Sequence, residues 1–126
     1  MMRILSPPAA AALLATILCA PVTHADGDAT KGRTIAEKHC SRCHVVGEFN
    51  KFGGIGSTPS LQGIKYMADW RDRFQTFYAL RPHPAFVRIP GIAPPTKQAP
   101  YTTPVHLTLD DVADVLAFAE TLPTPR

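Results

Sequence analysis

The sequence predicts a small all-α domain, and three observations support this prediction. Three segments carry apolar residues at helical spacing, with capping residues at their ends. The segments between them hold most of the 13 prolines, which favour loops. The chain has 126 residues and begins with an export signal, which leaves residues 26–126 for folding. That length is enough for one domain and too short for two.

The first 25 residues have the three parts of a signal peptide. Met1–Arg3 is a short positive start, Ile4–Ala20 is apolar and rich in alanine, and Thr23–Ala25 offers small residues to a signal peptidase. The apolar run is interrupted by prolines and is short for a membrane span, which argues against a retained anchor. Cys19 follows a large leucine and so fits a lipoprotein signal poorly. We therefore predict that residues 1–25 are removed and that the mature chain is periplasmic, with no membrane span.

The first predicted helix covers residues 29–39. Asp28 can cap its start, because an aspartate side chain accepts hydrogen bonds from the first free N–H groups of a helix. Gly32 lowers the helix propensity of this segment, and we expect a close approach by another helix as the packing reason for it. The helix leads directly into Cys40.

The second predicted helix covers residues 68–80. Its aromatic residues recur at helical spacing and make one face, formed by Trp70, Phe74, Phe77 and Tyr78. Such a stripe is typical of a core-facing helix, and it can equally form the wall of a cofactor site.

The third predicted helix begins after Thr108 and ends before Pro123. Thr108 and Asp111 have the spacing of a capping box, and the acidic first turn suits the positive end of the helix dipole. A wide apolar stripe is expected to face the core. It comprises Leu109, Val112, Leu116 and Ala119, with Val115, Phe118 and Leu122 beside them.

The segment Cys40-Ser41-Arg42-Cys43-His44 has the pattern Cys-x-x-Cys-His, which is typical of a c-type haem attachment site. Two thiols at this spacing can form thioether bonds to the two vinyl groups of one porphyrin. The adjacent histidine then lies beneath the iron and can be its proximal ligand. The sequence therefore predicts one covalently bound haem c, with its iron, held by Cys40, Cys43 and His44.

Other uses of these cysteines explain the sequence less well. A structural zinc site needs four ligands, and the only further cysteine, Cys19, lies in the predicted signal peptide. A redox dithiol normally lies between a strand and a helix, whereas the residues before Cys40 read as helical. A plain disulfide gives no reason for His44.

Charge is unevenly distributed along the predicted mature chain. It carries 12 Lys and Arg after loss of Arg3, against 10 Asp and Glu. The charged residues within 51–97 are mostly basic, and those within 98–126 are mostly acidic. A basic surface can steer an acidic redox partner, although an ordinary solvated surface explains each single charge as well. Basic and aromatic residues do not cluster as nucleic-acid binding requires.

In the order of its parts, the chain resembles the class I c-type cytochromes, small bacterial electron carriers with a single haem. A helix runs into Cys40–His44, and a loop with Thr58-Pro59-Ser60-Leu61 follows. Next come a middle helix and a proline-rich loop. The last helix ends in Val115–Leu122. The resemblance implies a cytochrome c-like fold, with three main helices wrapped around the haem. It also implies that Gly32 and Phe118 stand where the first and last helices cross. By the same resemblance, the carbonyl of Pro59 accepts the second ring N–H of His44 and fixes its orientation.

The sixth ligand of the iron is where the chain departs from the family pattern. A related bacterial subgroup reads Pro-His-Pro-x-Met-Pro in the loop before the last helix, and here Phe86 stands in the methionine position. His83 in the same loop is the favoured substitute, because the prolines on both sides restrict its backbone. An iron without a second protein ligand, His106 and Met67 remain alternatives. The loop of residues 81–107 is expected to wrap the distal side of the haem, with Phe86 and Val87 in contact with the macrocycle.

The resulting hypothesis is an extracytoplasmic electron carrier and not an enzyme, working with a redox partner that could be a dehydrogenase or an oxidase. The alternative is a haem protein with an open distal site that binds small gases or has minor peroxidase activity. A dithiol oxidoreductase without haem is a third possibility.

Overall fold

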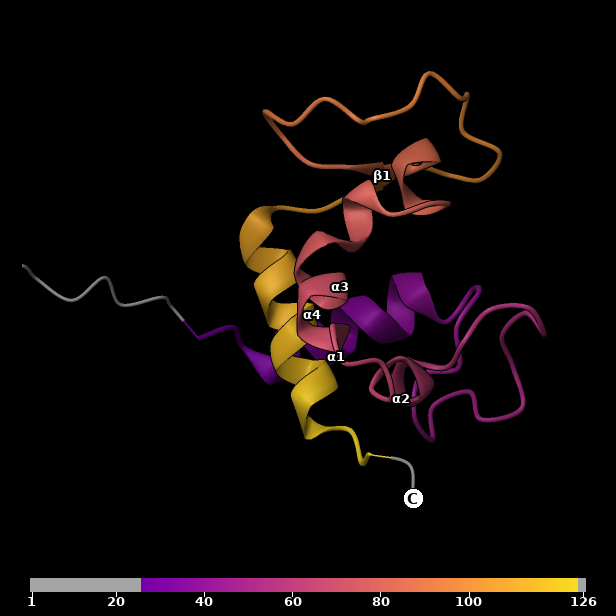
Figure 1. Ribbon diagram of the computed structural model, residues 1–126, viewed down its shortest axis with the longest axis vertical. Coiled ribbons are helices and arrows are strands. Elements are labelled where there is room, and N and C mark those ends of the chain that lie inside the picture. Colours follow the sequence, from indigo (N-terminus) through magenta and orange to yellow (C-terminus); the bar gives the residue numbers. More distant parts are fainter. Residues whose placement is uncertain (1–25, 125–126) are drawn as a thin grey trace, which may run out of the picture.

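The computed structural model describes residues 26–124, and the predicted signal peptide lies outside the described residues. The fold is mostly helical, which confirms the all-α prediction (Figure 1). The elements are α1 (Ala29–Ile35), a π-helical turn η1 (Ala36–Cys40), α2 (Leu61–Ile64), α3 (Trp70–Thr76), two 3-10 turns η2 (Phe77–Ala79) and η3 (His83–Ala85), strands β1 (Val87–Arg88) and β2 (Val105–His106), and α4 (Leu109–Thr121).

The predicted helix starts agree with the caps that the structure shows. The Asp28 side chain accepts from the N–H groups of Thr30 and Lys31, and Thr108 and Asp111 form a complete capping box. Two helices are less regular than predicted, because the first ends in a π-helical turn and the second begins at Trp70 and tightens into a 3-10 turn. The π-helical turn ends at Cys40, so the irregular backbone lies where the attachment motif begins.

Helices α1 and α4 cross in close contact at Gly32. A Cβ atom on this glycine would overlap the carbonyl oxygen of Asp114, so only glycine lets the two backbones approach this far. Asp114 is buried in α4, and its Oδ1 accepts the backbone N–H of Asp28 at 2.6 Å. Phe118, one turn further along α4, is also buried. The expected close crossing of the first and last helices is therefore present.

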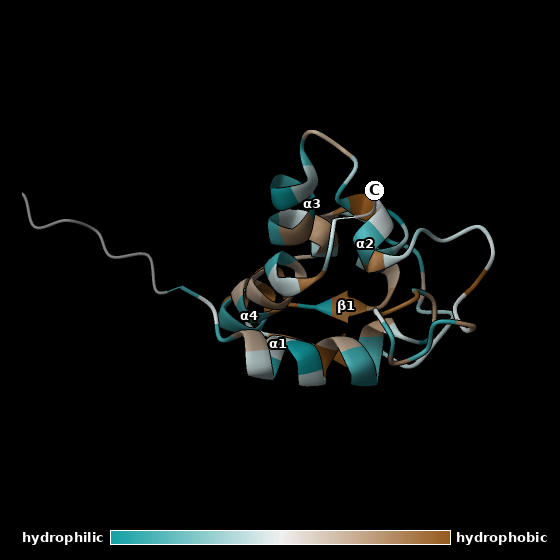
Figure 2. Ribbon diagram, turned by 90° about the horizontal axis from the view of Figure 1, so that it is seen from below, coloured by the Kyte–Doolittle hydropathy of each residue, from teal (hydrophilic) through white to brown (hydrophobic). Residues whose placement is uncertain are grey.

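Two groups of buried side chains make up the core, and α4 contributes to both. The first joins η1, α2, α3 and α4 and comprises Ala36, Val46, Leu61, Phe74, Val115, Phe118, Ala119 and Leu122. The second lies around the strands and comprises Val87, Ile89, Val105, Leu107 and Val112. Figure 2 shows β1 in the middle of the molecule, with one hydrophobic and one hydrophilic residue, and hydrophilic residues along the outer sides of α1 and α3. One predicted core residue, Leu109, is instead 53% exposed, because the first turn of α4 extends past the core.

The proline-rich segment before α4 divides into two parts. Its beginning and end are tied together by parallel pairing of Val87 with Val105 and of Arg88 with His106, a small sheet that the sequence did not predict. Between the strands, residues 90–104 are almost entirely exposed and extend away from the helices (Figure 1). The expectation that the whole loop covers one site is therefore wrong for most of this middle part, of which only Tyr101 contributes to the cavity described below. Within residues 26–124, no helix is long and apolar enough to cross a membrane.

Candidate functional site

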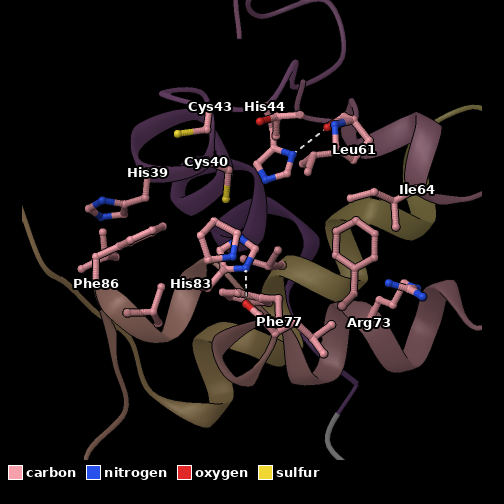
Figure 3. A pocket seen from close by; sticks show the side chains of 18 of the residues that line it. His39, Cys40, Cys43, His44, Leu61, Ile64, Arg73, Phe77, His83 and Phe86 are labelled. Carbon is pink, nitrogen blue, oxygen red and sulfur yellow. Dashed lines mark hydrogen bonds between the residues drawn. The ribbon is translucent and has the colours of Figure 1, made fainter. Parts of the chain in front are cut away.

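A cavity of about 450 Å³ lies between the end of the first helix and the segment that follows α3. Its walls are mostly apolar, and Figure 3 shows the sulfurs of Cys40 and Cys43 and the rings of His44 and His83 gathered around it. The volume is in the range of cofactor sites, which run from about 300 to 1,000 Å³. All five residues predicted to bind the cofactor line this cavity: Cys40, Cys43, His44, Pro59 and His83.

The attachment segment is a compact turn at the end of η1. The backbone N–H of His44 donates to the carbonyl of Cys40 at 2.8 Å, so the second cysteine and the histidine follow Cys40 around one turn. Asn50 holds this turn from outside: its amide donates to the carbonyls of Ser41 and His44, and its Oδ1 accepts from Val46. Sequence reasoning missed Asn50, because its role depends on backbone groups that no motif identifies.

The proximal histidine is fixed by a hydrogen bond on one ring nitrogen. His44 Nδ1 donates to the carbonyl oxygen of Pro59 at 2.7 Å. A proton on Nδ1 leaves Nε2 with its lone pair, which is the form that binds a metal ion.

His83 is held in the same way on the other side of the cavity. Its Nδ1 donates to the carbonyl oxygen of Leu80 at 3.0 Å, so Nε2 again carries the lone pair. The rings of Phe77 and Phe86 pack against the imidazole, with centroids at 5.4 and 5.8 Å. Burial lowers the pKa of His83, which keeps the ring neutral and able to bind a metal ion.

The two imidazoles face each other with ring centroids 6.0 Å apart and planes only 5° apart. Two bonds of about 2 Å to one metal ion, with each ring centre about 1.2 Å behind its nitrogen, would place the centroids about 6.4 Å apart. The observed separation is close to this value. The donor set and its spacing therefore fit a haem iron with two histidine ligands.

The other candidates for the sixth ligand are less well placed. His106 is exposed on β2 and does not line the cavity. Met67 lines the cavity but is 40% exposed. Phe86, which stands in the methionine position of the related subgroup, packs between His83 and Tyr101. His39, which precedes the attachment motif, is half-buried and lines the cavity as well.

Two arginines are the only lining residues that are always charged. Arg73 comes from α3 and pairs with Asp69 at 2.8 Å, while Arg81 follows η2 and is exposed. Figure 3 shows Arg73 on the side of the cavity away from Cys40 and Cys43. The basic composition of this part of the chain was visible in the sequence, but the placement of these two cations at the cavity was not.

The thiol environment disfavours a redox dithiol. Burial raises the pKa of Cys40 to about 12, whereas a reactive dithiol needs a pKa that is lowered toward neutral pH. In the part of the chain that the structure covers, no three His, Cys, Asp or Glu side chains converge to hold a metal ion directly. A protein-chelated zinc therefore has no site among residues 26–124.

The helical fold and this cavity define a c-type haem protein. A family model described as Cytochrome c matches residues 29–123, well over half of the chain, and the chain therefore belongs to the cytochrome c family. The predicted family is confirmed, and with it the cofactor: one covalently attached haem c with its iron, used for electron transfer with redox partner proteins. Neither the curated proteins nor the solved structures gave a significant match.

Proposed function

We propose that the chain is a periplasmic electron carrier whose haem is attached through Cys40 and Cys43 and ligated by His44 and His83. The placement of the two imidazoles supports this proposal most directly, because both rings line one cavity with centroids 6.0 Å apart, and a backbone carbonyl binds Nδ1 of each ring and so leaves the lone pair on Nε2. Cleavage after residue 25 and export are part of the proposal and are supported by the pattern of residues 1–25.

The haem, when bound, supplies a one-electron change between ferric and ferrous iron. The residues around the haem would keep the same positions in the ferric and the ferrous state. A backbone carbonyl orients each of the rings of His44 and His83, so neither ring would have to move when the electron arrives or leaves. Phe77, Phe86 and Val87 line the cavity and exclude water, which favours the less charged ferrous state relative to an exposed haem.

Arg73 and Arg81 would hold the two propionate groups of the haem. Thioether bonds place the vinyl half of the porphyrin at Cys40 and Cys43, and the propionates lie on the opposite half of the ring. Arg73 stands on that side of the cavity, and each guanidinium can donate two parallel hydrogen bonds to a carboxylate. The residues that line the cavity include no carboxylate that would repel the propionates.

The partner is a redox protein, which could be a dehydrogenase or an oxidase. Arg81 and Lys51 are exposed basic residues of the region that we expect to attract an acidic partner.

The proposal is tested on protein matured in the periplasm of a host that attaches haem c. We expect an intact mass equal to that of residues 26–126 plus one haem, and a low-spin ferric spectrum. Because the imidazole planes are nearly parallel, the electron paramagnetic resonance spectrum should be of the ordinary rhombic type and not the highly anisotropic type of perpendicular planes. A high-spin ferric iron, or rapid uptake of carbon monoxide by the ferrous protein, would contradict the two-histidine carrier and favour the open-site alternative.

A further inference from the structure

The side chain of Arg88 donates hydrogen bonds to the backbone of the segment that follows His83. Its Nη1 donates to the carbonyl oxygens of Pro84 at 3.0 Å and Val87 at 2.9 Å, and its Nη2 donates to that of Ala85 at 3.1 Å. The guanidinium thus satisfies three carbonyls of one short stretch of backbone. No ion pair to a carboxylate involves Arg88 among the described residues.

Two of these carbonyls, those of Pro84 and Ala85, belong to the turn that carries His83, and the third belongs to Val87, the neighbour of Arg88 in β1. Element η3 has only three residues, His83–Ala85, so its own hydrogen bonds do little to hold it in one conformation. Its end leaves carbonyl groups without partners in the turn, and a cation there is favourable. A planar guanidinium can donate to several of them at once with little loss of its own freedom.

Arg88 itself is fixed to the rest of the molecule through its backbone. It lies in β1, paired with β2, and its carbonyl accepts the N–H of Leu107 at 3.0 Å just before α4. The neighbouring carbonyl of Phe86 accepts the N–H of Val105 at 2.8 Å. A continuous set of contacts therefore runs from α4 through the small sheet and Arg88 to the turn of His83.

We propose that Arg88 is a positioning residue that keeps the His83 imidazole on the iron and so closes the distal side to small gases. This inference rests on the proposed role of His83 as ligand. Releasing the turn would let His83 leave the iron for part of the time, and the apparent affinity for an exogenous ligand rises with the fraction of protein in that open state. With Arg88 in place the protein would act as an electron carrier, and without it the same fold would bind small gases.

The test compares Arg88→Met and Arg88→Lys with the wild-type holoprotein, with Arg71→Met as the control. Met keeps much of the apolar stem without donors, whereas Lys keeps the charge and loses the planar fork. Arg71 pairs with Glu120 on the surface and does not line the cavity. We expect Arg88→Met to bind carbon monoxide in the ferrous state at least about 10-fold more tightly and to gain a high-spin ferric fraction, with Arg88→Lys between it and wild type. Arg71→Met should match wild type in both measurements.

A merely structural role of Arg88 would give a different result. In that case both variants would unfold at lower temperature, yet keep a fully low-spin ferric spectrum and the carbon monoxide affinity of wild type, and the inference would be overturned. If Arg88→Met fails to mature, Arg88→Lys decides alone by the same two measurements. Failure of the proposed function is recognised separately, because then wild type itself would be high-spin or His83→Ala would leave the low-spin spectrum unchanged.

Discussion

The imidazole rings of His44 and His83 lie parallel on opposite sides of one cavity, 6.0 Å apart, although 39 positions separate them in the chain. Each ring is oriented by a backbone carbonyl, that of Pro59 for His44 and that of Leu80 for His83. The orientation therefore belongs to the folded chain itself. A site in which both ligands are held in place before the metal binds needs little rearrangement during electron transfer.

Replacing His83 by alanine should open the distal side of the haem. Removal of the imidazole leaves an apolar space between the rings of Phe77 and Phe86. We expect the ferric spectrum to change from low-spin to mainly high-spin, and the ferrous protein to take up carbon monoxide. His106→Ala is the matched control, because His106 is exposed outside the cavity and its removal should change neither spectrum. A low-spin spectrum in His83→Ala would show that another group ligates the iron.

Replacing Arg73 or Arg81 by glutamine should lower the reduction potential. A nearby cation stabilises the ferrous state, because the haem then carries one positive charge less than in the ferric state. Potentiometric titration of the holoproteins measures the effect, and Arg71→Gln controls for a loss of charge elsewhere on α3. Equal shifts in all three variants would mean that Arg73 and Arg81 act only through the net charge of the molecule.

The sequence predicted the cofactor better than the details of the site. Cys40, Cys43 and His44 are adjacent in the chain, so their chemistry could be recognised from local spacing alone. Helix starts were equally local, since Asp28 and Thr108 cap through residues within three positions. Leu109 was wrongly placed in the core, because periodicity cannot tell how far a helix extends beyond the elements that cover it.

Residues whose side chains bind backbone carbonyls could not be predicted. Asn50, Lys65 and Arg88 all bind backbone carbonyls, and a carbonyl is present at every position, so no sequence pattern identifies the acceptor. The strands β1 and β2 have two residues each, too few to show a strand period, and their pairing closes the exposed loop of residues 90–104. His83 was the favoured of several candidates for the sixth ligand, but its position opposite His44 depends on the fold and could not be predicted from the sequence.

Replacing Lys65 by methionine should destabilise the holoprotein by about 2 kcal/mol, since hydrogen bonds from a charged group contribute about 1.5–3 kcal/mol each. Its Nζ donates to the carbonyls of Ala119 at 3.0 Å and Leu122 at 2.5 Å, which lie at the free end of α4. The variant leaves both carbonyls without this donor. Chemical denaturation measures the loss, and Lys51→Met is the control because Lys51 makes only an exposed pair with Glu48. A loss no larger than that of the control would mean that water replaces Lys65 at the helix end.

Replacing Gly32 by alanine should destabilise the holoprotein by about 2 kcal/mol, even though alanine is the better helix former by about 1 kcal/mol. The new methyl group would meet the backbone of Asp114 and Val115, which cannot rotate away as a side chain could. Helix α4 would have to move off α1, and the buried contact between Asp28 and Asp114 would lengthen with it.

Gly56→Ala controls for the loss of a glycine, because no atom lies within 4 Å of the position that its Cβ would occupy. Its free energy of unfolding should stay within about 0.5 kcal/mol of wild type. The spectrum of Gly32→Ala should remain low-spin, since α4, the helix that would move, carries neither His44 nor His83. If Gly32→Ala were as stable as wild type, the two helices would be able to separate at no cost, and the close crossing would not be what fixes α1 against α4.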